Sequence, residues 1–160
     1  MRFEHLVQIN DPLQPLLTEV SRAQLWCGLV RRAEKPTEFV LGLDRATIEA
    51  RSETDGALEL ERTLDFGSFK VRDRVRLTAG TLSVTDVEGS AHYANSRMTI
   101  RIEEPATGDL FLRFIYESEE HMGSGELDTL TVQLREQAYR SADIDTVWRI
   151  RELVERGALD

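Results

Sequence analysis

Arg62 and Asp73 are the residues whose types and placing point most directly to chemistry. An arginine can hold a ligand carboxylate or enolate, and an adjacent aspartate can fix the guanidinium or act as a base. The same two residues can instead form a structural ion pair that closes one end of a sheet. Buried pairs cost desolvation energy and often add no net stability. Both interpretations stay open at this point.

His5 and Tyr116 are the second pair of candidates. Both fall on the inward-facing side of the strands expected around them, where an imidazole and a phenol can act as acid–base or hydrogen-bonding groups. A core histidine with satisfied hydrogen bonds is the alternative and the commoner outcome. A flat ligand would also need aromatic walls, and the candidates, each more often ordinary core, are Trp26, Phe66, Phe114 and Trp148.

The sequence carries no pattern typical of a metal or cofactor site. His5, His92 and His121 lack the helical spacing of paired metal ligands, and His92 and His121 fall in expected exposed loops. The chain has no nucleophile-elbow, phosphate-loop or dinucleotide motif. Its single cysteine, Cys27, excludes an internal disulfide and is expected to be a buried structural thiol. We therefore expect no metal and no cofactor.

A β-hairpin fixes how Arg62 and Asp73 are placed. Residues 58–66 and 69–77 alternate in polarity on either side of Gly67-Ser68, and a two-residue turn with Gly first is typical of a type II′ hairpin. This turn pairs residue 66 with 69 and Arg62 with Asp73. On the other face the same register pairs acids with bases, at Asp65–Lys70, Glu61–Arg74 and Glu59–Arg76. Both faces favour one register, which turns Arg62 and Asp73 inward and suggests a lined cavity.

The remaining elements follow from periodicity and capping signals. Residues 2–10 are expected to form a strand, and residues 22–34 a helix that starts with a Ser21–Gln24 capping box and stops at Pro36. Residues 42–117 predict six strands. A long carboxy-terminal helix, either continuous or interrupted near residues 141–145, is expected to pack on the sheet through an apolar stripe, formed by Leu127, Leu130, Leu134, Ile144 and Trp148.

This order predicts an α+β fold in which a seven-stranded antiparallel sheet wraps around the carboxy-terminal helix. With 160 residues the chain is expected to form a single domain over residues 1–160. A net charge of −9 argues against nucleic acid or an anionic membrane as the main partner. The amino terminus has no long apolar run, so a cytoplasmic location is expected, as a monomer or homodimer.

Several segments resemble one known superfamily. They are FEHLVQIN at 3–10, LWCGLVRRAEKPTEFVLGLDRATI at 25–48, VRDRV at 71–75 and SADIDTVWRIREL at 141–153, with Arg62 before the hairpin turn. Together with the element order, they resemble the START-like, Bet v 1-like (SRPBCC) superfamily, and its AtaL-like branch in particular. The resemblance implies a helix-grip fold with a hydrophobic cavity, and it carries over no agreed catalytic residues.

Two functions are compatible with this expectation. The first is binding of a small hydrophobic or aromatic molecule in a cavity between the curved sheet and the carboxy-terminal helix, oriented by Arg62 and Asp73. The alternative is an enzyme of the polyketide cyclase or aromatase type, which would use Asp73, His5 or Tyr116 for proton transfer in the same cavity. A third possibility is a protein that works by association, with a cavity filled by its own side chains. A strongly perturbed titratable group at the cavity wall would favour the enzyme.

Overall fold

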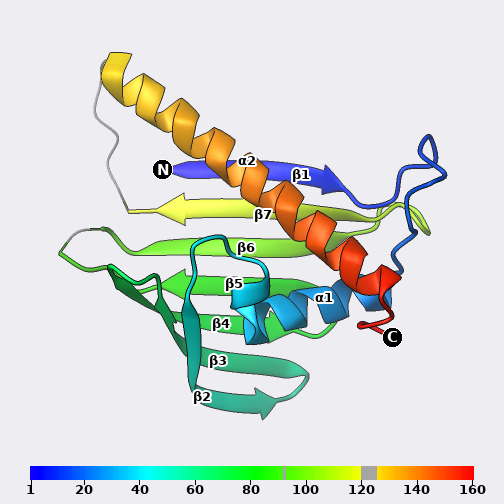
Figure 1. Cartoon of the computed structure of the whole chain (residues 1–160), viewed down its shortest axis with the longest axis horizontal. Coiled ribbons are helices and arrows are strands. Elements are labelled where there is room, and N and C mark those ends of the chain that lie inside the picture. Colours follow the sequence, from blue (N-terminus) through cyan, green and yellow to red (C-terminus); the bar gives the residue numbers. More distant parts are fainter. Residues whose placement is uncertain (92, 120–125) are drawn as a thin grey trace.

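The structure, a computed structural model, describes residues 1–91, 93–119 and 126–160. His92, His121 and the side chain of Leu127 lie outside what it describes. Its helices and strands are β1 (Arg2–Gln8), α1 (Arg22–Glu34), the 3-10 helix η1 (Pro36–Glu38), β2 (Arg45–Thr54), β3 (Ala57–Asp65), β4 (Lys70–Thr78), β5 (Leu82–Val87), β6 (Ser96–Glu103), β7 (Phe111–Ser118) and α2 (Glu126–Glu155). Figure 1 shows this arrangement, which confirms the predicted order.

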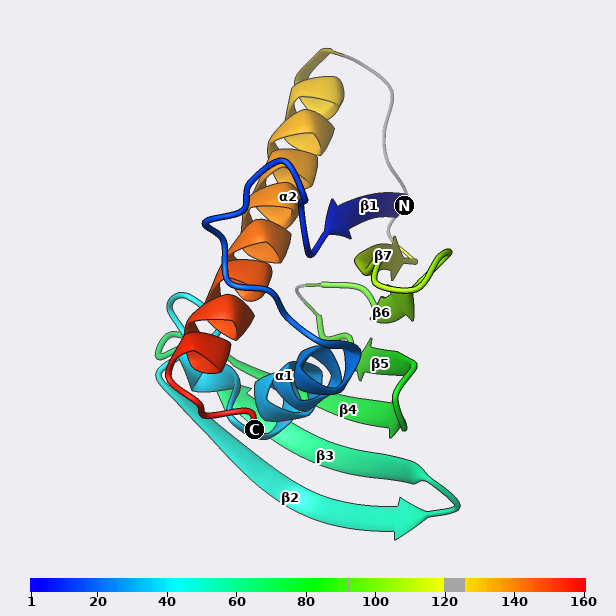
Figure 2. The same ribbon diagram turned by 90° about the vertical axis from the view of Figure 1, so that its right-hand side faces the viewer.

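The seven strands form one antiparallel sheet in the order β1-β7-β6-β5-β4-β3-β2. The chain runs along this order from β2 to β7, and β1 closes the other edge beside β7. Both helices lie on one face of the sheet, and the sheet bends around them (Figure 2). This arrangement is the helix-grip fold that the sequence predicts. No helix in the described part of the chain is long and apolar enough to cross a membrane.

The β3–β4 hairpin has the predicted register. Arg62 pairs with Asp73, and a backbone hydrogen bond of 2.9 Å joins Phe66 N to Phe69 O across the turn. Gly67 has a φ of 90°, which a side chain rarely tolerates. The phenyl rings of Phe66 and Phe69 stack with centroids 4.9 Å apart. On the outer face the predicted ion pair between Glu61 and Arg74 is present at 2.6 Å.

Helix α1 begins where its capping residues predict. The Ser21 hydroxyl accepts a hydrogen bond from Gln24 N, and the Gln24 side chain accepts one from Ser21 N. A Cβ added at Gly28 would lie 2.8 Å from Ile150 Cγ1, so glycine allows α1 and α2 to approach closely. Cys27 is exposed. The prediction of a buried thiol was wrong, because Cys27 falls on the side of α1 that faces away from Gly28 and the core.

Helix α2 is continuous, but it buries a different face from the predicted one. Trp148 is 55% exposed and Ile144 is 44% exposed, whereas Ile150 is only 1% exposed. Leu130 and Leu134 are exposed as well. The buried face holds Asp143, Thr146, Val147, Ile150, Arg151, Leu153 and Val154. The predicted packing of the apolar stripe against the sheet was therefore wrong.

Polar contacts and the close helix pair explain this rotation. Asp143 hydrogen-bonds to His5 and Tyr116 on β1 and β7, and Arg151 donates to the backbone oxygen of Ile9. Ile150 sits on Gly28. These contacts fix which side of α2 faces the sheet. The main core then forms between α1, α2 and strands β6 and β7, and it includes Leu25, Leu29, Ile100, Leu112, Phe114, Val147 and Ile150.

Candidate ligand cavity

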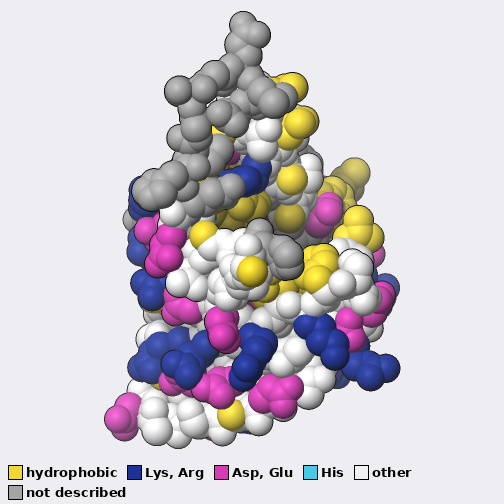
Figure 3. All heavy atoms as spheres, turned by 90° about the vertical axis from the view of Figure 1, so that its left-hand side faces the viewer, with side chains coloured by type: hydrophobic (Ala, Val, Ile, Leu, Met, Phe, Trp, Pro, Cys, Tyr) yellow, Lys and Arg dark blue, Asp and Glu magenta, His cyan; other side chains and the backbone are white. Residues whose placement is uncertain are grey.

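A cavity of about 250 Å³ lies between the concave face of the sheet and the two helices. Its apolar wall includes Val40, Leu64, Val87 and Met98. Its polar wall includes Arg32, Arg62, Asp73, Tyr116 and Tyr139. Figure 3 views the molecule from the end at which β7 stops, where hydrophobic side chains gather above a band of charged side chains of both signs.

The Arg62–Asp73 pair crosses from β3 to β4 and is buried, with Arg62 only 5% exposed. Arg62 Nε and Nη2 donate to the two carboxylate oxygens of Asp73 at 2.8 and 2.6 Å, and Nη1 donates to the backbone oxygen of Ala33 at 2.8 Å. The guanidinium thus meets the carboxylate in the parallel, bidentate geometry and also ties β3 to the end of α1. Its charge is balanced inside the protein.

Asp143 on α2 is the centre of a second polar group. Its Oδ2 lies 3.0 Å from His5 Nδ1, and its Oδ1 accepts the hydroxyl of Tyr116. Burial raises the pKa of the Asp143 carboxyl, although the hydrogen bonds from Tyr116 and His5 act in the opposite direction. Burial and the neighbouring carboxylate also raise the pKa of the Tyr116 phenol. Tyr116 is therefore held as a neutral hydrogen-bond donor.

Two tyrosines form a flat part of the cavity wall. The rings of Tyr116 and Tyr139 stack with centroids 3.9 Å apart and planes 8° from parallel. Phe3 lies beside both rings, with its centroid 6.2 Å from Tyr116 and 5.9 Å from Tyr139. Strands β1 and β7 supply two of these rings, and α2 supplies the third.

Arg32 enters the cavity from the last turn of α1. Its Nε is buried, and no hydrogen-bond partner for it occurs among the described residues. Its Nη2 makes a weak hydrogen bond to the sulfur of Met98 at 4.0 Å. Burial lowers the pKa of the Arg32 guanidinium, and the positive charge of Arg62 acts in the same direction.

The structure brings together some of the predicted site residues. Arg62, Asp73 and Tyr116 line the cavity. His5 stands behind Tyr116 and reaches the site through Asp143. Phe114 is fully buried in the main core, and Phe66 stacks on Phe69 at the hairpin tip.

The two tryptophans do not reach this cavity. Trp148 faces away from the sheet, because α2 buries its opposite side. Trp26 lies on the flank of α1 and lines a separate groove of about 650 Å³ with Cys27, Ile48 and Leu159. Both were predicted to contact a ligand in the cavity between the sheet and α2, and that placing was wrong.

Arg32, Tyr139 and Asp143 were not among the site residues predicted from the sequence. All three are helical, and their direction depends on which helix face is buried. A signal was present for Arg32, which lies three and seven residues after Leu29 and Leu25 and so shares their buried stripe. Asp143 lies four residues before Val147 and shares a face with it in the same way.

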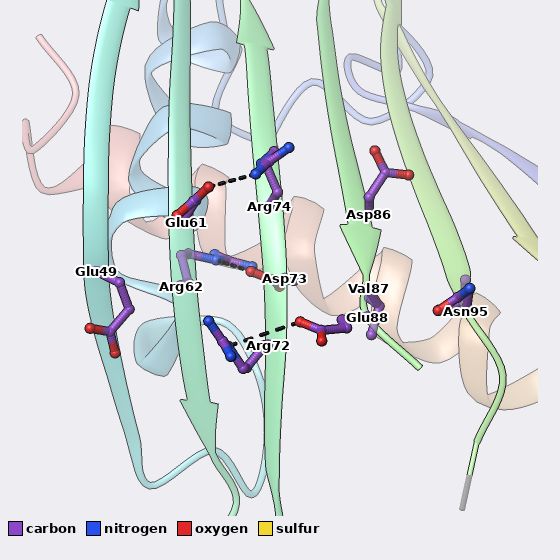
Figure 4. A pocket seen from close by; sticks show the side chains of 11 residues that line it. Glu49, Glu61, Arg62, Arg72, Asp73, Arg74, Asp86, Val87, Glu88 and Asn95 are labelled. Carbon is purple, nitrogen blue, oxygen red and sulfur yellow. Dashed lines mark hydrogen bonds and ion pairs between the residues drawn. The ribbon is translucent and has the colours of Figure 1, made fainter. Parts of the chain in front are cut away.

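A second hollow, of about 430 Å³, lies along strands β2–β5 and carries mainly charged side chains (Figure 4). Arg74 is paired with Glu61 at 2.6 Å, and Arg72 with Glu88 at 3.9 Å. These four side chains are largely exposed and pair with one another. Arg62 and Asp73 line this hollow as well as the cavity. Among the described residues, no His, Cys, Asp and Glu side chains are grouped as a metal site requires.

Comparisons with solved structures support the fold. The di-domain ARO/CYC StfQ from the steffimycin biosynthetic pathway superimposes with a TM-score of 0.67 at 10% identity, covering 98% of this chain and 52% of StfQ. The chain thus spans about half the length of StfQ. Zhui aromatase/cyclase from Streptomyces sp. R1128 gives a TM-score of 0.59 at 11% identity, covering 98% and 94% of the two chains.

A START superfamily protein from Mycobacterium smegmatis is similar to the same degree, with a TM-score of 0.60 at 11% identity, covering 95% of this chain and 98% of that one. No curated protein matched the sequence significantly. At these identities the likeness extends to the fold. The model of one family, described as "AtaL: Acetylaranotin biosynthesis cluster protein L", matches residues 7–157. The chain therefore belongs to the AtaL family.

Proposed function

We propose that the protein binds a small ring compound in the cavity between the sheet, α1 and α2. The observation that carries this proposal is the cavity itself, whose lining combines apolar side chains with several polar groups. Ligand sites commonly combine a mainly apolar lining with a few placed polar groups. The protein's own side chains do not fill the cavity, and this argues against a function in association alone.

The size of the cavity limits the ligand. An apolar cavity of about 150 Å³ holds benzene, so a volume of about 250 Å³ suits a compound of one or two rings. The stacked rings of Tyr116 and Tyr139 offer a flat surface against which such a compound can pack. Met98 adds a flexible, polarizable side chain that adapts to the ligand's outline.

Blocking the cavity tests this proposal. We expect naphthoate to bind the protein, measured by isothermal titration calorimetry, and Met98→Trp to abolish binding by filling the space. Val84→Trp is the matched control, because Val84 lies on β5 opposite Arg76, on the outer face of the sheet. The proposal fails if a folded Met98→Trp variant binds as tightly as the unmodified protein, or if the unmodified protein binds no ring compound.

A second function, aromatase- or cyclase-type catalysis, is favoured by the group around Asp143. StfQ and Zhui carry that description. Tyr116 lines the cavity and donates its hydroxyl to Asp143, so the pair is suited to take a proton from carbon next to a carbonyl: the phenol oxygen accepts it as its own proton passes to the carboxylate. Carbon–carbon bond formation followed by loss of water would then close a ring.

A small acyclic diketone that closes to a cyclohexenone tests this second function. The product has a strong ultraviolet absorption, so its formation can be followed directly. We expect turnover by the unmodified protein and a rate at least about 100-fold lower for Asp143→Asn, the loss typical of removing a general base. Arg31→Met, outside the cavity, should keep the full rate. An equal rate with Asp143→Asn would rule out this role for the carboxyl.

A further inference from the structure

Three arginines line the cavity, and they differ in what balances their charge. Arg97 is paired with Asp86 at 2.6 Å. Arg62 is held by both oxygens of Asp73 and by the backbone oxygen of Ala33. For Arg32 no carboxylate lies within ion-pair distance among the described residues, and its buried Nε has no partner there. A ligand anion would therefore compete with Asp73 at Arg62 but with no carboxylate at Arg32.

The acids nearest to Arg32 are already engaged. Asp143 uses one oxygen for His5 and the other for Tyr116. Asp73 uses both oxygens for Arg62. Both carboxylates act on Arg32 through their fields without touching it. A cation whose Nε is buried without a partner carries a desolvation cost that a direct contact would offset.

Resting on the function proposed above, we infer that Arg32 is the ligand's anchor and that the ligand is a small aromatic carboxylic acid. A carboxylate matches the planar guanidinium through parallel hydrogen bonds from Nε and one Nη nitrogen. Nε is the atom that lacks a partner, and Nη2 makes only the weak contact with the sulfur of Met98. The carboxylate would take up both donors once the guanidinium turns its buried Nε toward the cavity.

The remaining side chains of the cavity contact the part of the ligand that carries no charge. Leu64, Val87 and Met98 present apolar surface, while Tyr116 and Tyr139 present the stacked rings. A flat ring bearing one carboxylate places its charge at Arg32 and its apolar part against these side chains. A neutral ring compound would fill the same volume and leave Arg32 without a partner.

Naphthoate and naphthamide provide the test, because they have nearly the same shape and differ in charge. We expect the unmodified protein to bind naphthoate about 10- to 100-fold more tightly than naphthamide, the effect of a charged hydrogen bond. Arg32→Met should bind both compounds equally, at the affinity for the amide. Arg32→Lys, which keeps the charge and loses the planar fork, should show an intermediate preference.

Arg31→Met is the matched control. Arg31 is the neighbour of Arg32 on α1, but its guanidinium pairs with Glu38 at 2.8 and 3.0 Å and does not line the cavity. This variant should keep the full preference for the acid. Each variant is first checked by circular dichroism for an unchanged fold, and Arg32→Lys decides the outcome if Arg32→Met does not fold.

The outcomes separate this inference from the proposed function. If the unmodified protein binds acid and amide equally well, or if a folded Arg32 variant keeps the full preference for the acid, Arg32 is not the anchor, while the cavity remains a binding site. If the unmodified protein binds neither compound, the proposed function fails and the inference fails with it.

Discussion

The polar side chains of this cavity differ in whether the protein itself supplies their hydrogen-bond and ion-pair partners. Arg62 and Asp73 satisfy each other, and Asp143 is satisfied by His5 and Tyr116. Arg32 differs because its buried Nε has no partner among the described residues. A protein that only needed stability would gain from an apolar side chain at this position. Residues of this kind are typical of binding sites, where function is maintained at a cost in stability.

The first prediction concerns that cost. Arg32→Met should raise the free energy of unfolding by about 1–3 kcal/mol, because it removes a buried donor without a partner. Thermal and urea unfolding without added ligand would measure the change. Arg31→Met should be neutral or slightly destabilising, since it breaks the partly exposed pair with Glu38. A clear loss of stability in Arg32→Met would mean that the protein satisfies Arg32 by itself.

The second prediction separates structure from binding at Arg62. Arg62→Met and Asp73→Leu should each cost about 3–5 kcal/mol, because each leaves one buried charge without its partner. The double variant should recover most of this loss and should still bind naphthoate, since we assign the anchor to Arg32. Urea unfolding and calorimetry would measure both quantities. A stable double variant that no longer binds naphthoate would show that Arg62, and not Arg32, anchors the ligand.

The third prediction is a pH dependence that originates at Asp143. Because burial raises the pKa of this carboxyl in the folded protein, its ionisation costs more in the folded than in the unfolded state. Its contribution to stability is therefore full below the unfolded pKa of about 4 and is lost as the pH rises through the folded pKa. Asp143→Asn removes the titration.

The measurement is the stability difference between Asp143→Asn and the unmodified protein across a pH series. This difference should shift in favour of the asparagine variant as the pH rises above about 4 and should level off once the folded pKa is passed. A difference that stays constant over the whole series would show that the Asp143 pKa is the same in both states.

At the scale of elements, α2 shows how polar contacts can override an apolar stripe. The most regular apolar spacing along this helix, from Leu130 to Trp148, ends on the outside. The buried face instead combines Val147, Ile150 and Val154 with Asp143 and Arg151. Binary patterning assumes that charged residues mark the solvent side. Here Asp143 hydrogen-bonds to His5 on β1 and Tyr116 on β7, and Arg151 to the backbone oxygen of Ile9, so that assumption selects the wrong face.

Two isoleucines on α2 provide a matched test of the buried face. Ile150→Ala should cost about 2–5 kcal/mol, because Ile150 is 1% exposed and packs on Gly28. Ile144→Ala, on the same helix and 44% exposed, should cost less than about 1 kcal/mol. Equal losses, or a larger loss at Ile144, would mean that α2 is rotated relative to the structure described.

At the scale of the whole molecule, the sequence was informative where short-range rules apply. The glycine turn and the charge pairs set the β3–β4 register, and with it the inward pairing of Arg62 and Asp73. The capping box and Pro36 set the bounds of α1. The family resemblance supplied the topology, which no local signal determines.

Short-range rules did not predict the other polar residues in and around the cavity. Arg32 lines the cavity, and Asp143 contacts Tyr116 in its wall, because two helices separated by about ninety residues pack at Gly28 and Ile150. The rotation of each helix about its axis depends on that contact and on hydrogen bonds to β1 and β7. Strand residues alternate between faces, so their direction follows from parity alone. The direction of a helical side chain, by contrast, can be predicted only when the tertiary contacts of its helix are known.

The central claim, that the cavity holds a small ring compound, is tested most directly by methionine methyl NMR. The chain has 3 methionines, so the spectrum is simple, and Met98 lies in the cavity wall. Titration with naphthoate should shift the Met98 methyl resonance and produce nuclear Overhauser contacts between that methyl group and the ligand's ring protons. Binding that leaves the Met98 resonance unmoved and without such contacts would contradict the account.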